Sequence, residues 1–264
     1  MLLEGVSIRA TSRLSGLDKN TVQRLMERAG EQCRQFLADT IRNVPVAELQ
    51  IDEVWSFVAA KEKTAFFQIL PYDTGDCYTF TAIDRDTKLL VAYHVGKRTA
   101  DDTMKFARKL ALTVSGKPHV STDGYSPYRT CIPEAFGYDV NHGMIIKNFN
   151  NPSTTERRRY SPPAIIAIKI TQNCGSSDAG QVCTSHIERH NLTVRMQNRR
   201  FTRLTNAFSK KWENHEAMFA LFAAWYNFCR VHMTLKTTPA VAAGLANEAW
   251  TLERLLREIA RVAE

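Results

Sequence analysis

The sequence lacks the cysteine pairs that hold zinc ribbons and small disulfide-linked domains together. No C-x-x-C pair occurs among its six cysteines, which are Cys33, Cys77, Cys131, Cys174, Cys183 and Cys229. Both kinds of framework need paired cysteines, so we expect reduced and mostly structural thiols.

Long apolar runs are also missing. No segment approaches the roughly 18 to 20 apolar residues of a membrane-spanning helix, and the N-terminus has neither the basic nor the apolar region of a signal peptide. These absences predict a cytoplasmic protein without a membrane partner.

What is present is a globular, basic composition. A chain of 264 residues that is 44% hydrophobic can form a full core and a small additional domain. Its 35 lysines and arginines against 27 acids give a formal net charge of +8, which suits a polyanionic partner such as nucleic acid. Charge alone does not identify that partner.

Residues 5–16 and 17–33 predict two helices joined by a tight turn at Gly16. This pattern is typical of a helix-turn-helix DNA-binding region, which we place over residues 1–43. An ordinary helical hairpin would show the same pattern.

Within that region we expect an inward face and a DNA-facing surface. The residues expected to pack inward are Ile8, Ala10 and Leu14. Asp18 or Asn20 is expected to cap the second helix. The residues expected to face DNA are Thr21, Gln23, Arg24 and Arg28.

Residues 44–240 predict a catalytic α/β region. Three strands are expected first, as an antiparallel meander, over residues 48–58, 78–83 and 89–95. A helix and a short strand follow over 100–114 and 117–123, and later helices are expected from Thr184 or Ser185 and over 214–229.

Two parts of the chain have weaker patterns. Residues 141–183 show no strong periodicity beyond Ile165–Ile170 and predict a partly mobile insertion or loop. We expect residues 241–264 to form a C-terminal helix.

Three acids are candidate catalytic and metal-binding residues. Asp52 lies inside an apolar strand, Asp123 ends a strand before a glycine, and Glu188 lies near a helix start. Each has a simpler interpretation: an ion pair for Asp52, a turn aspartate for Asp123, and a capping box from Ser185 for Glu188. Glu53 should point to the opposite face of the strand from Asp52.

Phosphoryl transfer between DNA strands explains why three such acids would converge. Two Mg²⁺ ions about 4 Å apart can activate the attacking oxygen and neutralise the leaving oxygen. Each ion takes one or two carboxylates, with water and phosphate oxygens completing its shell.

A basic stretch without acids follows Glu188. Its seven cations are Arg189, Arg195, Arg199, Arg200, Arg203, Lys210 and Lys211. Such a stretch can follow a DNA backbone, although a solvated charged surface would have the same composition.

Four sequence blocks, in their order, resemble the DDE transposases, and more narrowly those of the insertion sequence one family of bacterial mobile elements. The blocks are Ile51-Asp52-Glu53-Val54-Trp55-Ser56, Thr122-Asp123-Gly124-Tyr125, His186-Ile187-Glu188-Arg189-His190-Asn191 and Tyr226-Asn227-Phe228-Cys229-Arg230-Val231-His232, with Leu235 and Thr238-Pro239. The family's basic residue seven positions after the glutamate falls on Arg195. The resemblance covers roughly residues 45 to 240.

The resemblance implies a ribonuclease H-like fold, with a mixed sheet flanked by helices, and a transposase that cleaves DNA strands and joins them. It implies that Asp52, Asp123 and Glu188 bind two Mg²⁺ ions, which Mn²⁺ can replace, and that Arg195 contacts the DNA backbone. The expected partners are double-stranded DNA, at the element ends and the target, and further copies of the chain in a homodimer or larger assembly at the nucleoid.

Two other functions remain open at this point. A helix-turn-helix regulator, or an inactive transposase remnant, would bind DNA without carboxylate chemistry. A structure-specific nuclease on the ribonuclease H-like fold would share the metals but lack strand transfer.

The aromatic side chains Trp225, Tyr226 and Phe228 are expected in the core, whereas Asn227, Arg230 and His232 are expected to make polar contacts.

Overall fold

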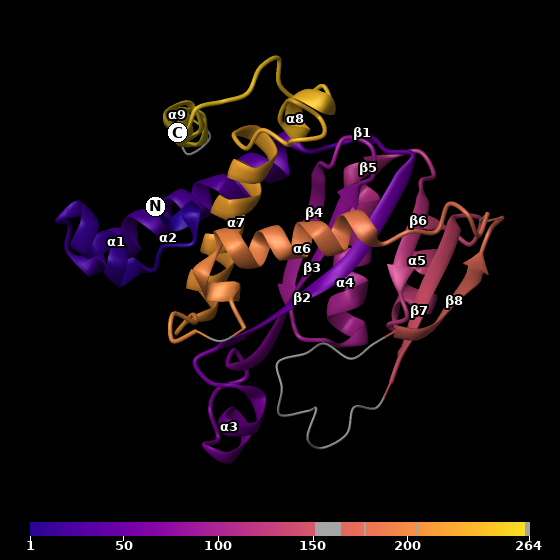
Figure 1. Cartoon of the computed structure of the whole chain (residues 1–264), viewed down its shortest axis with the longest axis horizontal. Helices are drawn as coiled ribbons and strands as arrows, with labels where there is room; N and C mark the ends of the chain where they lie inside the picture. The colour runs from indigo at the N-terminus through magenta and orange to yellow at the C-terminus, as the bar shows by residue number, and fades with distance from the viewer. Residues whose placement is uncertain (151–164, 177, 204, 262–264) are drawn as a thin grey trace.

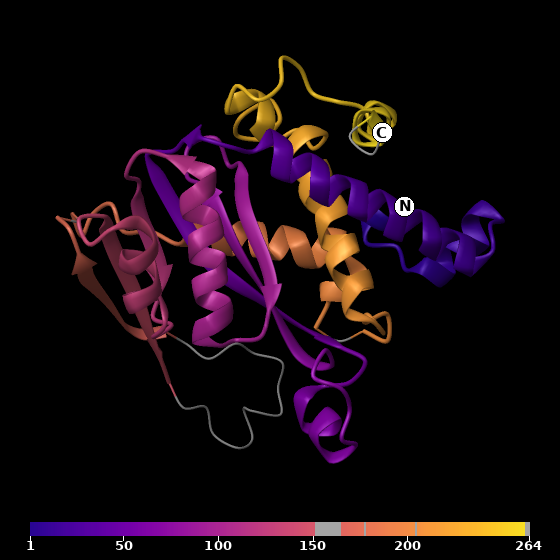
Figure 2. The same cartoon turned by 180° about the vertical axis from the view of Figure 1, so that it is seen from behind.

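A mixed sheet of six strands lies at the centre of the protein, with helices on both of its faces (Figures 1 and 2). The computed structural model describes residues 1–150, 165–176, 178–203 and 205–261. It confirms the α/β class and the mixed sheet flanked by helices. In these residues, none of the helices combines the length and the apolar character that a membrane span requires.

The strands of the sheet run in the order β4-β3-β2-β6-β7-β8. Their bounds are Glu48–Val58 for β2, Gly75–Asp84 for β3, Leu90–Gly96 for β4, His119–Asp123 for β6, Asn141–Phe149 for β7 and Ile165–Cys174 for β8. β2, β3 and β4 form the predicted antiparallel meander. β6 pairs in parallel with both β2 and β7, so the sheet becomes parallel at the β2–β6 boundary.

The β2 strand is apolar because it is covered on both faces. Leu49, Ile51 and Val54 are fully buried. Helices on both sides of a sheet turn the usual alternation of apolar and polar residues into a nearly continuous apolar run. Acids in such a strand therefore need a specific partner.

Two helices cover one face of the sheet, and a third crosses the other (Figures 1 and 2). The first two are α4 (Ala100–Thr113) and α5 (Tyr128–Phe136), and the third is α6 (Ser185–Gln197), which packs on β2 and β3. α7 (Trp212–Phe228) packs against β4 and the N-terminal helix α2 (Lys19–Thr40). The core joins all of these elements.

Shorter elements complete the chain. They are η1 (Leu2–Glu4), the paired strands β1 (Val44–Pro45) and β5 (Val114–Ser115), α3 (Glu62–Phe67), η3 (Arg199–Phe201), α8 (Pro239–Ala242) and α9 (Leu252–Arg261). The predicted C-terminal helix over 241–264 was too long, because residues 243–251 between α8 and α9 are not helical. Residues 262–264 lie outside the described residues.

Two helices, α1 (Ile8–Ser15) and α2, form the N-terminal region. Gly16 ends α1 with φ at 75°, and Asp18 Oδ1 caps α2 by accepting from Asn20 N at 2.8 Å. The expectation that Leu14 packs inward was wrong, since its side chain is 68% exposed. α1 packs mainly on α2 at the edge of the molecule, where Leu14 remains exposed (Figure 1).

The prediction of an insertion or loop over residues 141–183 was also wrong for the two segments that form strands. Residues 141–149 and 165–174 are β7 and β8, which pair antiparallel at one edge of the sheet. β8 is exposed along most of its length, with Ile166 and Ile168 more than half exposed. An edge strand of this kind has no buried face and so no period-two signal. Residues 151–164 lie outside the described residues.

Candidate active site

Asp52 and Asp123 lie side by side because two parallel strands reach the same edge of the sheet. The register of β2 and β6 places Ile51 opposite Thr122, and the two aspartates are the next residue of each strand. β6 ends at Asp123. Functional side chains commonly occupy this position in sheets with parallel strands, at their carboxyl ends.

Three carboxylates converge at this point. Asp52, Glu53 and Asp123 each present one oxygen, and these three oxygens lie within 4.8 Å of one another. As predicted, the two side chains leave β2 towards opposite faces, Asp52 towards Asn191 on α6 and Glu53 towards Arg98 and Tyr128, yet their carboxylate oxygens approach each other at the strand edge. Because β6 stops at Asp123, β2 has no partner on that side beyond Ile51, and the Asp52 carboxylate turns along the free edge to accept from Glu53 N at 2.8 Å.

Burial and mutual repulsion make these acids hard to ionise. The pKa of Asp52 is raised to about 7, first by burial and then by the charge of Asp123. The pKa of Glu53 is raised to about 8 by burial and by the charges of Asp123 and Asp52. Burial also raises the pKa of Asp123. A cation among the three carboxylates would remove the repulsion that causes part of these shifts.

Arg98 supplies positive charge at the rim of the cluster. Its Nη2 lies 3.7 Å from Glu53 Oε2 and 4.0 Å from Asp123 Oδ2. The guanidinium carbon lies 4.2 Å from the centre of the Tyr125 ring. The contacts with the acids are too long for close ion pairs, so Arg98 balances their charge without occupying the space between them.

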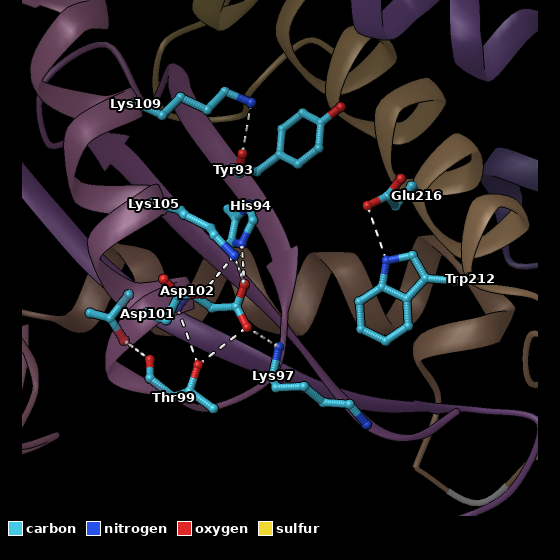
Figure 3. Close-up of polar contacts among 11 residues, drawn as sticks. Tyr93, His94, Lys97, Thr99, Asp101, Asp102, Lys105, Lys109, Trp212 and Glu216 are labelled. Atoms are coloured by element: carbon cyan, nitrogen blue, oxygen red, sulfur yellow. Dashed lines mark hydrogen bonds and ion pairs between the residues drawn. The ribbon is translucent and has the colours of Figure 1, made fainter. Parts of the chain in front are cut away.

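The turn that carries Arg98 is fixed by Asp102 at the start of α4 (Figure 3). Asp102 Oδ2 accepts from Lys97 N at 2.9 Å and from Thr99 Oγ1 at 3.3 Å, and Oδ1 lies 2.9 Å from His94 Nε2. Burial alone would raise the pKa of Asp102, but the hydrogen bonds from His94 and Lys97 outweigh it, and the pKa is lowered. Through these hydrogen bonds, the ionised Asp102 side chain connects the start of α4 to His94 of β4 and to the turn between them.

Asn191 on α6 holds the Asp52 carboxylate from the opposite side. Its Nδ2 donates to Asp52 Oδ2 at 2.8 Å, and its side chain is buried. Sequence reasoning missed Asn191, Arg98 and Glu53 as site residues. The position of Asn191 three residues after Glu188, on the same face of a helix, was the one signal that could have found it.

Glu188 lies close to the cluster without being part of it. Its charge contributes to the raised pKa of both Asp52 and Asp123. Within the described residues, however, its carboxylate does not meet the 4.8 Å separation that joins Asp52, Glu53 and Asp123. It instead pairs with Lys147 on β7 and accepts from Thr184 Oγ1 at 2.8 Å.

The capping-box interpretation of Glu188 does not describe this helix. The N-cap of α6 is Thr184, and the first turn is capped by Gln50 of β2, whose Oε1 accepts from His186 N at 3.0 Å and Ile187 N at 3.1 Å. Gln50 thus accepts from the first-turn N–H groups that an N-cap serine or threonine side chain would otherwise satisfy. The Glu188 side chain, 46% exposed, faces Lys147 and the acid cluster's side of the sheet.

The residues expected to bind DNA divide into exposed and inward-facing sets. The exposed cations are Arg24, Arg28, Arg189, Arg199, Arg203, Lys210 and Lys211, whereas Thr21 and Gln23 are half-buried. Arg195 and Arg200 make internal contacts. Arg195 Nη1 donates to the backbone oxygen atoms of Trp55 at 3.3 Å and Phe201 at 3.0 Å.

Arg200 is largely enclosed between α2 and the residues that precede α7. It donates to Ser209 Oγ at 3.0 Å and contacts Met26 Sδ at 3.3 Å, and burial lowers its pKa to about 10. The sequence alone cannot distinguish such a buried arginine from its exposed neighbours, because composition does not show whether a side chain points into the protein or into solvent.

A basic groove of about 820 Å³ lies between the N-terminal helices and residues 198–211. Among the described residues, its lining contains no acid and six cations, which are Arg9, Lys19, Arg199, Arg200, Lys210 and Lys211. Gln23 of the predicted DNA-facing set also lines it. Partial burial and the charge of Arg9 lower the pKa of Lys210, which indicates that the cations are close enough to repel one another. A phosphodiester backbone would relieve that repulsion.

The block over residues 226–232 has a structural role at its centre. Tyr226 and Phe228 are buried in the core, as expected. Asn227, expected to make polar contacts, is also buried, and it forms two hydrogen bonds with the backbone of Leu90.

No protein-family model matches the chain, and no curated protein matches its sequence. The functional argument therefore depends on the residues and their geometry.

Proposed function

We propose that the chain is a DNA transposase of the DDE type, of the insertion sequence one family, which cleaves DNA strands and transfers them at a divalent-metal site. The observation that carries the proposal is the convergence of Asp52 and Asp123, 71 residues apart in sequence, within one cluster of carboxylate oxygens. Phosphoryl transfer needs such a cluster because Mg²⁺ binds oxygen ligands and requires few from the protein.

The residues present fit a divalent ion. Three carboxylate oxygens lie within 4.8 Å of one another, and among the residues that the structure describes the buried Glu53 Oε1 has no hydrogen-bond partner. In the proposed site, Asp52, Asp123 and Glu188 hold two Mg²⁺ ions, which Mn²⁺ can replace. When bound, the ions supply an activated oxygen nucleophile and neutralise the leaving oxygen.

The other residues have supporting roles in this proposal. Asn191 orients the Asp52 carboxylate, and Arg98 lies where it can approach a phosphate oxygen once the acids have a cation. Lys147 holds Glu188 at the rim. The mixed sheet with its acids at one edge is compatible with a ribonuclease H-like fold, which we propose for the region over residues 44–240.

The proposed substrate is double-stranded DNA at the element ends and the target, bound partly through α1 and α2 as a helix-turn-helix. The acid-free groove beside these helices supports a polyanionic partner. Transposition requires two DNA ends to be held together, so we propose a homodimer or larger assembly acting on nucleoid DNA.

The experiment is a nicking and strand-transfer assay on supercoiled DNA that carries candidate element ends, with Mg²⁺, Mn²⁺ or EDTA. Wild type, Glu188→Gln and Asp123→Asn are compared, with Glu213→Gln as an exposed acid control. Metal-dependent cleavage and joined products from wild type and the control alone would support the proposal. Cleavage without joining would favour a structure-specific nuclease, and binding without cleavage a regulator or an inactive remnant.

A further inference from the structure

Glu53 has the least satisfied carboxylate of the acid cluster. Its side chain is 3% exposed, and its Oε1 has no hydrogen-bond partner in the described part of the chain. Arg98 approaches the other oxygen, Oε2, at 3.7 Å. A buried carboxylate in this condition is costly unless it is neutral or faces a cation.

Tyr128 does not remove this deficit. Its buried hydroxyl lies near enough to affect the pKa of Glu53. Yet neither Tyr128 Oη nor Glu53 Oε1 has a hydrogen-bond partner of normal geometry among the described residues. If Glu53 only stabilised the fold, we would expect its carboxylate to form a hydrogen bond with Tyr128 or a short, bidentate ion pair with Arg98.

The position of Glu53 allows its free oxygen to bind a cation. The Glu53 carboxylate lies within 4.8 Å of oxygens from Asp52 and Asp123, whereas Glu188 lies outside that group and is paired with Lys147. Oxygens at this separation can surround one hard cation, since each metal–oxygen distance would be about 2 to 2.5 Å.

We propose that Glu53 is a ligand of one divalent cation, Mg²⁺ or Mn²⁺, which it binds together with Asp52 and Asp123 before DNA is present. Glu188 then contributes to the second ion position, which becomes complete only when DNA phosphate oxygens arrive. This inference rests on the proposed function for the kind of site and assigns a residue that the transposase resemblance does not assign.

The test is Mn²⁺ binding to the full chain without DNA, measured from the loss of the free-ion electron paramagnetic resonance signal. We expect Glu53→Gln, which keeps the side-chain shape and removes the charge, to weaken Mn²⁺ binding about ten-fold or more. The exposed control Glu213→Gln should bind close to wild type. Mn²⁺ should also raise the melting temperature of wild type but not of Glu53→Gln.

Equal Mn²⁺ affinity in wild type and Glu53→Gln would overturn the inference, as would the absence of Mn²⁺ binding by wild type at millimolar concentration. If Glu53→Gln does not fold, Glu53→Asp retains the charge but withdraws the carboxylate by one methylene, and unchanged affinity in that variant would overturn it equally. DNA cleavage is scored separately. Cleavage with Glu53-independent Mn²⁺ binding rejects only the inference, whereas Glu53-dependent binding without any cleavage rejects only the transposase proposal.

Discussion

Asn191 donates a hydrogen bond of 2.8 Å to Asp52 Oδ2 and thereby joins α6 to the acidic residues of β2. The other Asp52 oxygen accepts from Glu53 N. With one donor on each oxygen, the carboxylate has a fixed orientation before any ligand binds. Fixed ligands lower the ordering cost of metal and substrate binding.

We expect Asn191→Ala to lower the rate of metal-dependent DNA cleavage by about 10- to 100-fold, as loss of a group that orients a metal ligand usually does. The fold should remain, because Asn191 contributes few apolar contacts to the core. Cleavage rates are measured at saturating Mg²⁺, with the exposed Asn247→Ala as the matched control. Unchanged cleavage in Asn191→Ala would show that the orientation of Asp52 does not limit the reaction.

Arg98 provides a second prediction, since it balances the charge of Glu53 and Asp123 from 3.7 and 4.0 Å. Replacing it in Arg98→Gln removes a cation that competes with the metal. We expect Mn²⁺ to bind roughly three- to ten-fold more tightly at low ionic strength, with a smaller effect in high salt. Titrations with Arg108→Gln, an exposed α4 arginine, serve as the control, and weaker binding by Arg98→Gln would contradict the prediction.

The basic groove predicts a specific salt dependence of DNA binding. Removing two exposed cations in Lys210→Gln/Lys211→Gln should weaken DNA affinity and reduce the slope of log K against log salt by up to about 2. Fluorescence anisotropy at several salt concentrations measures both. The control is Lys61→Gln/Lys63→Gln, which removes the same charge from residues that do not line the groove. Equal slopes for the two double variants would place the DNA elsewhere.

The convergence of Asp52 and Asp123 could be predicted because Asp52 lies within a strongly apolar strand and Asp123 ends a short strand before a glycine. Burial makes such strands easy to recognise, and an acid within one is a conspicuous exception. The convergence of Glu53 was not predictable, since it depends on where β6 ends and leaves the edge of β2 free. Alternation still places Asp52 and Glu53 on opposite faces of β2, but on the β6 side the pairing ends at Ile51, so the two carboxylates can approach each other around the free edge.

The β7–β8 hairpin and Arg98 were missed for different physical reasons. β8 is an exposed edge strand, so its isoleucines show no alternation between buried and exposed faces. Arg98 acts through a turn that is fixed by Asp102, eight residues along the chain from His94. Such tertiary hydrogen bonds have no signature in local sequence, and the inward direction of Arg195 has none either.

Asn227 offers a test of stability that is independent of the acid site. Its Oδ1 accepts from Leu90 N at 2.9 Å and its Nδ2 donates to Leu90 O at 3.0 Å, so it closes the edge of β4. Asn227→Leu would leave both backbone groups buried without partners, and we expect the free energy of unfolding to fall by about 2 to 4 kcal/mol. Urea denaturation with Asn247→Leu as control measures this, and a change below that of the control would contradict it.

His215 is buried between two hydroxyl groups, with Nε2 2.9 Å from Ser56 Oγ and Nδ1 3.0 Å from Ser209 Oγ. Burial, and to a smaller extent the charge of Arg200, lowers its pKa to about 3. In the unfolded chain the pKa is about 6.5, so between these values the unfolded state binds the extra proton. The stabilisation is fully present above about pH 6.5 and is lost as the pH falls towards 3.

The variant His215→Gln isolates this effect, because every other ionisable group is common to both proteins. We expect the variant to be less stable than wild type at pH 7.5, because a glutamine amide does not reproduce the geometry of both ring-nitrogen contacts, with Ser56 and Ser209. Below about pH 6 the difference in unfolding free energy should shrink by ~1.4 kcal/mol per pH unit. Urea denaturation at pH 7.5, 6.5 and 5.5 in EDTA gives the three differences. A difference that stays constant over this range would mean that His215 takes up its proton in the folded protein, and that the hydroxyl groups of Ser56 and Ser209 accommodate the imidazolium.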